Sequence, residues 1–168
     1  MTSPSHPYTI HARARQRAAA KAIGIDEAYI DRLVETFYGK VRTHPVLGPI
    51  FNGIIGETWG PHLRIMKDFW ESIALAAASY HGRPVPVHQE IADKFAPQHF
   101  PIWLGLFRQT LEETAPTPAA VLYFMERAER IAASLTIAVF ERPKDGGVPA
   151  LDLPEVIQAQ AQDRGVTL

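Results

Sequence analysis

The chain has 168 residues, 46% of them hydrophobic and 21% charged, and its formal net charge at neutral pH is -1. This length and composition are typical of one soluble domain with a sizeable core. The near-neutral charge does not favour nucleic acid, and no apolar run is long enough to span a bilayer or to form the core of a signal peptide. We therefore expect a cytoplasmic protein with no nucleic-acid partner and no membrane span.

The sequence contains no cysteine. This excludes disulfides, thiolate zinc sites, cysteine-ligated iron–sulfur clusters, and haem that is bound by a thiolate or attached through CxxCH. The absence also fits a reducing cytoplasm. A metal or cofactor site would therefore have to use other side chains.

The chain begins with a basic extension over residues 1–25, which we expect to be partly helical. It has no acidic residue and four basic ones, which are Arg13, Arg15, Arg17 and Lys21. A basic start without acids can resemble an organelle transit peptide, but we favour a solvated leading helix.

Helical periodicity continues from Asp26 to Phe140. The first helix of this core is predicted to begin after Asp26 as N-cap and to end before Pro45. Its inward positions recur at helical spacing and are Ile30, Leu33, Val34, Phe37, Tyr38 and Val41. The connector at 44–57, HPVLGPIFNGIIGE, is too rich in proline and glycine for a long helix.

The next helix is predicted from Trp59 to Ala77, and a histidine lies on its apolar stripe. His62 is followed at helical spacing by Ile65, Met66, Phe69, Trp70 and Ile73. This spacing is typical of the buried face of an amphipathic helix. Considered alone, such a histidine is more often a core residue hydrogen-bonded to a carbonyl than a functional group.

Two further helices and a short helical piece follow. After the connector SYHGRPVPV, a short helix at 88–95 would place His88, Ile91, Ala92 and Phe95 on one side. A helix whose start is framed by Pro97 and Pro101 has a stripe of Phe100, Trp103, Leu104, Phe107 and Leu111. The last long helix has Thr117 as N-cap and ends near Phe140. The tail at 141–168 could hold one short helix after Pro154. The predicted fold class is all-α.

Four helical segments each turn one polar-tipped side chain inward, namely Tyr38, His62, His88 and Trp103, which suggests a shared cavity. A buried tyrosine is about as often structural as functional, and a buried tryptophan is more often structural. No two of the seven histidines are three or four residues apart, and ExxH, GxSxG, P-loop and GxGxxG motifs are absent. Paired-ligand zinc and di-iron sites are therefore not indicated. Haem b needs one histidine and an apolar slot between helices, which this pattern makes plausible.

Several motifs together make the sequence resemble the group III truncated haemoglobins, the short two-over-two globins. They are FYGKVR at 37–42, LGPIF at 47–51, Trp59 with His62 and FW at 69–70, GRPV before His88, and FPIWLGLF at 100–107. The resemblance implies a globin-like, shortened two-over-two helical sandwich over residues 26–140. The chain departs from the family in its longer start, its tail, and the stretch between His88 and Trp103.

The resemblance implies haem b, with His88 as the proximal iron ligand and His99 as its rival. Phe51 matches the phenylalanine that packs against the macrocycle, and we also assign Met66, Phe69, Trp70 and Trp103 to the cofactor pocket. Tyr38, His62 and Trp103 match distal positions that face a bound ligand, so His62 is expected to contact the ligand or to gate its entry. Arg64 and Arg83 are candidates, by position, for the haem propionates.

The function implied is reversible binding of dioxygen, CO, NO or another small diatomic ligand by a monomer or weak dimer. Two hydrogen-bond donors from Tyr38 and Trp103 would make oxygen release slow, which suits ligand chemistry or sensing better than oxygen transport. The alternative is a redox enzyme, peroxidase-like or a nitric oxide dioxygenase, which would need an external reductase. A haem-free helical interaction module is the third hypothesis.

Overall fold

The computed structural model describes residues 7–141 of the chain. Over these residues every regular element is helical, which confirms the predicted all-α class. The elements are α1 (Pro7–Ala22), α2 (Glu27–Thr43), α3 (Leu47–Ile55), α4 (Trp59–Leu75), α5 (Pro84–Glu90), α6 (His99–Thr114), α7 (Pro118–Thr136) and the π-helical turn η1 (Ile137–Glu141). No helix among them is long and apolar enough to cross a membrane. The helix predicted after Pro154 lies outside the described residues.

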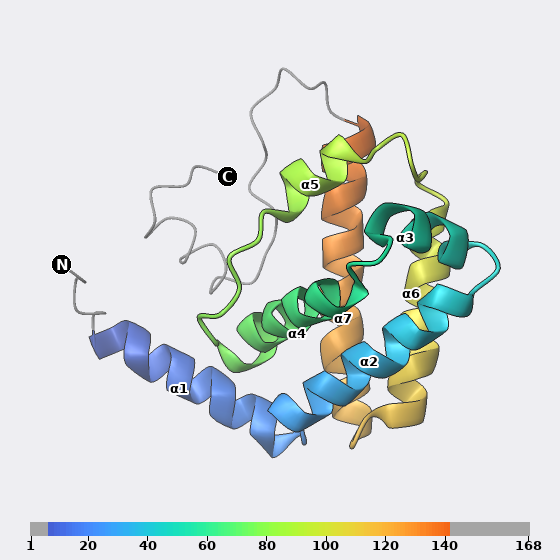
Figure 1. Cartoon of the computed structure of the whole chain (residues 1–168). Coiled ribbons are helices and arrows are strands. Elements are labelled where there is room, and N and C mark those ends of the chain that lie inside the picture. The colour runs from blue at the N-terminus through green and yellow to red at the C-terminus, as the bar shows by residue number, and fades with distance from the viewer. Residues whose placement is uncertain (1–6, 142–168) are drawn as a thin grey trace.

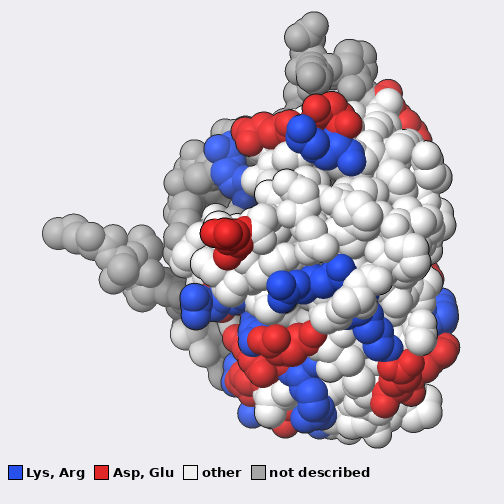
Figure 2. Space-filling view, turned by 45° about the vertical axis from the view of Figure 1, so that its right-hand side comes forward, with Lys and Arg blue, Asp and Glu red and all other residues white. Residues whose placement is uncertain are grey.

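The helices α2, α4, α6 and α7 form two crossed pairs. Helix α2 packs on α4, α6 packs on α7, and α2 also contacts α6. Figure 1 shows α6 and α7 side by side with α2 and α4 crossing them, while the short helices α3 and α5 lie at one end. This is the expected two-over-two sandwich. Acidic and basic side chains are interspersed over the surface, around a largely uncharged band in the view of Figure 2.

Helix α2 begins and ends as its sequence predicts. The Asp26 carboxylate accepts a hydrogen bond from the Tyr29 backbone N–H at 2.8 Å, so it caps the first turn. The helix ends at Thr43, before Pro45. All six predicted inward residues are buried, as is Tyr29. Helix α7 likewise starts from the predicted cap, because the Thr117 hydroxyl accepts from the Ala120 N–H.

Prolines occupy the first turns of the short helices in the two connectors, which agrees with the prediction of no long helix at 44–57 and corrects the bounds of the short helix predicted at 88–95. The segment at 44–57 contains α3, with Pro49 as its third residue. The short helix expected at 88–95 is α5, which runs from Pro84 to Glu90 and leaves Phe95 beyond its end. The first N–H groups of a helix have no acceptor within the helix, so proline costs little there and its fixed φ favours the first turn.

Helix α4 is enclosed unevenly along its length. Its last turn is buried on every side, from Ser72 to Leu75, because α1 and α7 also cover it. Its first half is covered on one face only, so Ile65, at the edge of the predicted stripe, is 48% exposed. The expectation that Ile65 faces inward was therefore wrong.

The leading helix α1 is packed along one side rather than fully solvated. Ala20 is buried in it, as is Ile25 just after it. The Gln16 side-chain amide donates to the carbonyl of Ile73 at 2.5 Å, and the Tyr123 hydroxyl donates to the same oxygen at 3.3 Å. Ile73 lies in the last turn of α4, where carbonyls lack partners within the helix. Helices α1 and α7 thus supply the missing donors at the end of α4.

Candidate functional site

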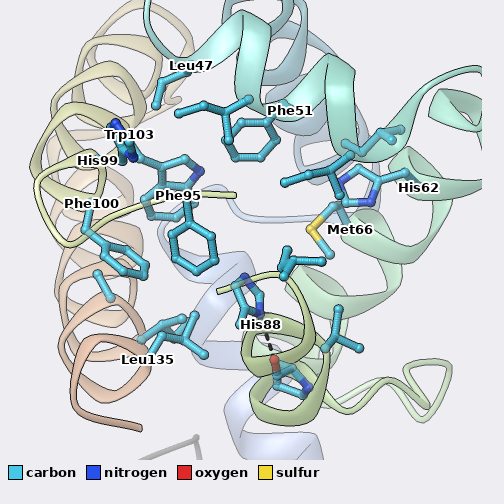
Figure 3. Close-up of a pocket in the computed structure, with 18 of the residues that line it drawn as sticks. Leu47, Phe51, His62, Met66, His88, Phe95, His99, Phe100, Trp103 and Leu135 are labelled. Carbon is cyan, nitrogen blue, oxygen red and sulfur yellow. Dashed lines mark hydrogen bonds between the residues drawn. The ribbon is translucent and has the colours of Figure 1, made fainter. Parts of the chain in front are cut away.

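A cavity of about 270 Å³ opens between α2, α3, α4, α5, α6 and α7. Its walls are mainly apolar, and Figure 3 shows His62 and Met66 on one side, Trp103 on the opposite side, and His88 below Phe95. The lining includes every residue that the sequence analysis assigned to the site: Tyr38, Phe51, His62, Met66, Phe69, Trp70, His88 and Trp103. His99 lines it as well. Segments from six helices are therefore brought together around one space.

His88 is held in a tautomer that suits metal ligation. Its Nδ1 lies 2.7 Å from the carbonyl oxygen of Pro84, one helical turn earlier. A carbonyl can only accept, so Nδ1 carries the proton and donates it, and Nε2 keeps a free lone pair. Burial lowers the pKa of His88, which keeps the ring neutral. A neutral imidazole whose second nitrogen is fixed by a carbonyl is the usual form of a metal-binding histidine.

His99 is in the opposite tautomer. Its Nδ1 accepts a hydrogen bond from the backbone N–H of Ala96 at 2.9 Å, in the turn that leads into α6. The proton of the neutral ring must then be on Nε2, which has no lone pair to offer. His99 therefore stabilises the start of α6, and of the two rivals His88 is the histidine prepared to bind a metal.

His62 is a half-buried histidine whose Nε2 lacks a polar partner in the described part of the chain. Its Nε2 is fully buried and has no hydrogen bond to any residue between 7 and 141. Burial lowers the pKa of His62, and repulsion from His88 lowers it further, so the ring is neutral. A structural core histidine would be hydrogen-bonded to a carbonyl, as His88 is. The unpaired nitrogen therefore fits a bound group that supplies its hydrogen-bond partner.

Tyr38 lies beside His62 and presents a second polar group. The two rings meet edge to face, with centroids 5.5 Å apart and planes at 90°. Tyr38 is only 4% exposed, and its hydroxyl has no hydrogen-bond partner in the described part of the chain. Burial raises the pKa of Tyr38 far above its ordinary value, so the hydroxyl stays protonated and can donate.

Trp103 is fixed by a column of stacked aromatic rings. Its ring stacks on Phe107 with centroids 5.4 Å apart, and Phe107 stacks on Trp70 at 5.3 Å. Phe37 contacts Trp103 edge to face at 5.5 Å. These contacts leave the Trp103 ring little rotational freedom at the cavity wall. Its indole N–H has no hydrogen-bond partner within residues 7–141, so this donor too is unused.

Tyr80 lines the cavity but was missed by the sequence analysis. It is 8% exposed, it packs edge to face on Phe69 at 5.1 Å, and burial raises its pKa to about 12. A Cβ at Gly82 would lie 2.3 Å from the Tyr80 hydroxyl, so the glycine of GRPV makes room for this ring. Tyr80 belongs to a connector without helical periodicity, and the sequence therefore held no signal for it.

The candidate propionate ligands, Arg64 and Arg83, lie at the surface. Both are exposed, and neither lines the cavity. Neither forms an ion pair with an acidic residue in the described ranges. Arg64 is two residues after the lining residue His62, and Arg83 immediately precedes the lining residue Pro84. This closeness in the chain is what links them to the site.

The polar groups of the cavity do not form a site for a bare metal ion. Within residues 7–141 no three histidine, cysteine or acidic side chains gather as a metal-binding cluster. One prepared histidine in an apolar cavity instead fits a flat, largely apolar cofactor that brings its own metal. A two-over-two helical sandwich around such a cavity defines a globin-type fold.

Comparison with known proteins identifies the family. No protein-family model matches the chain. The chain is 39% identical over 90 residues to the group 3 truncated haemoglobin Ctb of Campylobacter jejuni, an alignment that covers 52% of this chain and 70% of that protein. It also matches the crystal structure of the group III truncated haemoglobin from Campylobacter jejuni with a TM-score of 0.65 and 33% identity, over 73% of this chain and 95% of the other.

The chain belongs to the group III truncated haemoglobins. It is a globin-type haem protein, and membership of this family implies a haem cofactor and small diatomic ligands.

Proposed function

We propose that this chain binds haem b in the cavity through His88 and thereby binds dioxygen or another small diatomic ligand reversibly. The observation that carries the proposal is the hydrogen bond from His88 Nδ1 to the Pro84 carbonyl, which leaves Nε2 unprotonated. When bound, the haem supplies the iron at which the diatomic ligand binds. The apolar side chains Phe51, Met66, Phe69 and Trp70 hold its ring.

Retention of the cofactor is expected to depend mainly on these apolar walls. Haem is a largely apolar disc, and burial of some 400 Å² would be worth about 10 kcal/mol before association costs. The ligation by His88 therefore need not dominate haem retention. Loss of His88 should change how the haem is ligated rather than whether it is bound.

The distal groups have a common role, which is to donate to a ligand or to control access to it. The Tyr38 hydroxyl and the Trp103 indole N–H both lack partners within residues 7–141, so neither has to break a bond within the described protein in order to donate. His62 is neutral, so its unpaired Nε2 either accepts or donates according to the tautomer. We assign Tyr38 and Trp103 as donors and His62 as the residue that contacts the ligand or gates its entry.

Absorption spectroscopy of the haem-reconstituted protein tests this assignment. The ferric, ferrous and ferrous–CO spectra of the wild type should show an intense Soret band of a histidine-ligated haem. His88→Gly should alter the spectra, and added imidazole should restore them. His99→Gly is the matched control, because it removes a second cavity-lining histidine whose tautomer does not suit ligation. Spectra that respond to His99→Gly and not to His88→Gly would overturn the assignment, and a protein that takes up no haem would overturn the function.

A further inference from the structure

An asparagine bridges the end of α2 and the start of α4. The Asn52 side chain in α3 donates from Nδ2 to the carbonyl of Arg42 at 3.0 Å, and its Oδ1 accepts from the indole N–H of Trp59 at 3.1 Å. A carbonyl can only accept and an indole N–H can only donate, so the orientation of this amide is fixed by its two partners. Asn52 thereby ties Trp59 to the end of α2.

Trp59 packs against two of the three distal residues, Tyr38 and His62. Its ring centroid is 6.0 Å from that of Tyr38 and 5.7 Å from that of His62, with an interplanar angle of 87° to the imidazole. The Arg42 guanidinium lies 4.9 Å from the Trp59 ring centroid and contributes a cation–π contact. Trp59 is 6% exposed and neither it nor Asn52 lines the cavity. Both can therefore influence a ligand only through other residues.

No hydrogen bond determines where the His62 ring points. Neither ring nitrogen has a partner within the described ranges, and Nε2 is fully buried. What holds the ring is edge-to-face packing on Tyr38 and on Trp59. A ring held by packing alone changes its orientation when one packing surface moves.

We propose that the Asn52–Trp59 pair is a positioning element of the distal pocket, which sets the fraction of molecules in which His62 faces a ligand in the cavity. Asn52 fixes the indole, the indole supports the imidazole, and His62 transmits the effect to the ligand. This inference rests on the proposed function, since it concerns the distal side of the same cavity. It adds two residues outside the cavity that control one inside it.

The test compares three variants by infrared spectroscopy of the ferrous–CO protein, whose C–O stretching bands report how distal groups point at the ligand. Asn52→Leu removes the acceptor of the Trp59 bond and should change the ratio of the bands about fivefold, the shift expected from one neutral hydrogen bond. Asn52→Asp keeps an oxygen that can accept from the Trp59 indole but loses the amide that donates to the Arg42 carbonyl, so it should change the ratio less than Asn52→Leu does. Gln109→Leu is the matched control. Like Asn52→Leu it removes an exposed side-chain amide, but this amide donates to Glu113 within α6.

A double-mutant cycle separates positioning from general loosening of the fold. In a His62→Leu background, Asn52→Leu should no longer change the bands, because the residue that transmits the effect is gone. A shift that persists at full size there, or that Gln109→Leu reproduces, would overturn the proposal. An unchanged ratio in Asn52→Leu itself would also overturn it.

A second experiment needs no haem, and it distinguishes a failure of the proposed function from a failure of the positioning role of Asn52. In the NMR spectrum of the haem-free chain, the imidazole C–H resonances of His62 should be displaced by the ring currents of Tyr38 and Trp59. Asn52→Leu should move them toward ordinary values, and Asn52→Asp should move them less. If wild-type protein takes up no haem, the proposed function fails while this result still decides the role of Asn52. If haem binds and these resonances do not move, only the positioning role fails.

Discussion

Removal of the Tyr38 hydroxyl tests one of the two proposed donors to a bound ligand. The hydroxyl makes no hydrogen bond within the described part of the chain, so Tyr38→Phe orphans no group there. The phenyl ring keeps the edge-to-face contacts with Phe37 and His62. A change in ligand release would therefore come from the lost donor and not from repacking.

The size of the effect follows from the energy of one such bond. A hydrogen bond to a ligand that gains negative charge on binding is worth roughly 1.5–2 kcal/mol. Its loss should speed oxygen dissociation about 10- to 30-fold. Trp103 offers a second unused donor, and its stacking on Phe107 should survive replacement by phenylalanine. The double variant Tyr38→Phe/Trp103→Phe should release oxygen roughly a hundred- to a thousandfold faster than the wild type.

Stopped-flow displacement of oxygen by CO measures these rates. Tyr80→Phe is the matched control, because Tyr80 also lines the cavity, is also buried, and also lacks a hydrogen-bond partner for its hydroxyl in the described ranges. It should leave the dissociation rate within about twofold of the wild type, since its hydroxyl lies against Gly82 and the proposed donors to the ligand are Tyr38 and Trp103. Unchanged rates in both Tyr38→Phe and Trp103→Phe would refute the reasoning, as would an equal acceleration in the Tyr80 variant.

Three further predictions concern the stability of the haem-free chain. Burial lowers the pKa of His62 and of His88, so below about pH 6.5 the unfolded chain binds more protons than the folded one. The free energy of unfolding from urea titrations should then fall as the pH drops from 7 to 5.5, by at most about 1.4 kcal/mol per histidine per pH unit, and less steeply in His62→Leu. Gln16→Ala removes a donor to the Ile73 carbonyl and should lower the free energy of unfolding by about 1 kcal/mol in the same assay. Amide hydrogen exchange in α1 should become faster, and unchanged protection along α1 would contradict this. Lys67→Met breaks ion pairs with two acids of α2 and should cost less than about 1 kcal/mol, a difference that 1 M NaCl should remove.

Helices with a clear apolar period were predictable, and the bounds of the short helix α5 were not. The run from Asp26 to Val41 carries its own cap and a complete stripe, so α2 could be located from local signals alone. A proline, Pro45, follows the end of α2, whereas another proline, Pro84 in GRPVPV, starts α5. Which of the two occurs depends on where the first turn packs, and α5 is fixed by tertiary contacts such as the bond from the Gln89 amide to the Ala138 carbonyl of η1. No local pattern encodes that contact.

Helical periodicity also predicts which way a side chain points better than it predicts how deeply that side chain is buried. His62, Met66 and Ile65 lie on one predicted stripe, yet the first two line the cavity and the third is half exposed. The position of a side chain around the helix axis follows from the sequence. How much of that helix face is covered depends on which other helices pack against it. Tyr80 shows the converse case. It is buried in the site from a connector that has no period, so only the folded chain reveals it.

The choice between the two candidate proximal histidines shows what the fold adds to the chemistry. His88 and His99 have the same side chain, both line the cavity, and both precede the Trp103 position in the chain. They differ in the partner of one nitrogen, a carbonyl for His88 and an N–H for His99. That partner decides which nitrogen carries the proton, and so which ring can offer a lone pair to a metal. The helical turn from Pro84 to His88 brings that carbonyl within reach of the ring. The start of α5, which the sequence analysis misplaced, therefore gives His88 the tautomer that its proposed role as a ligand requires.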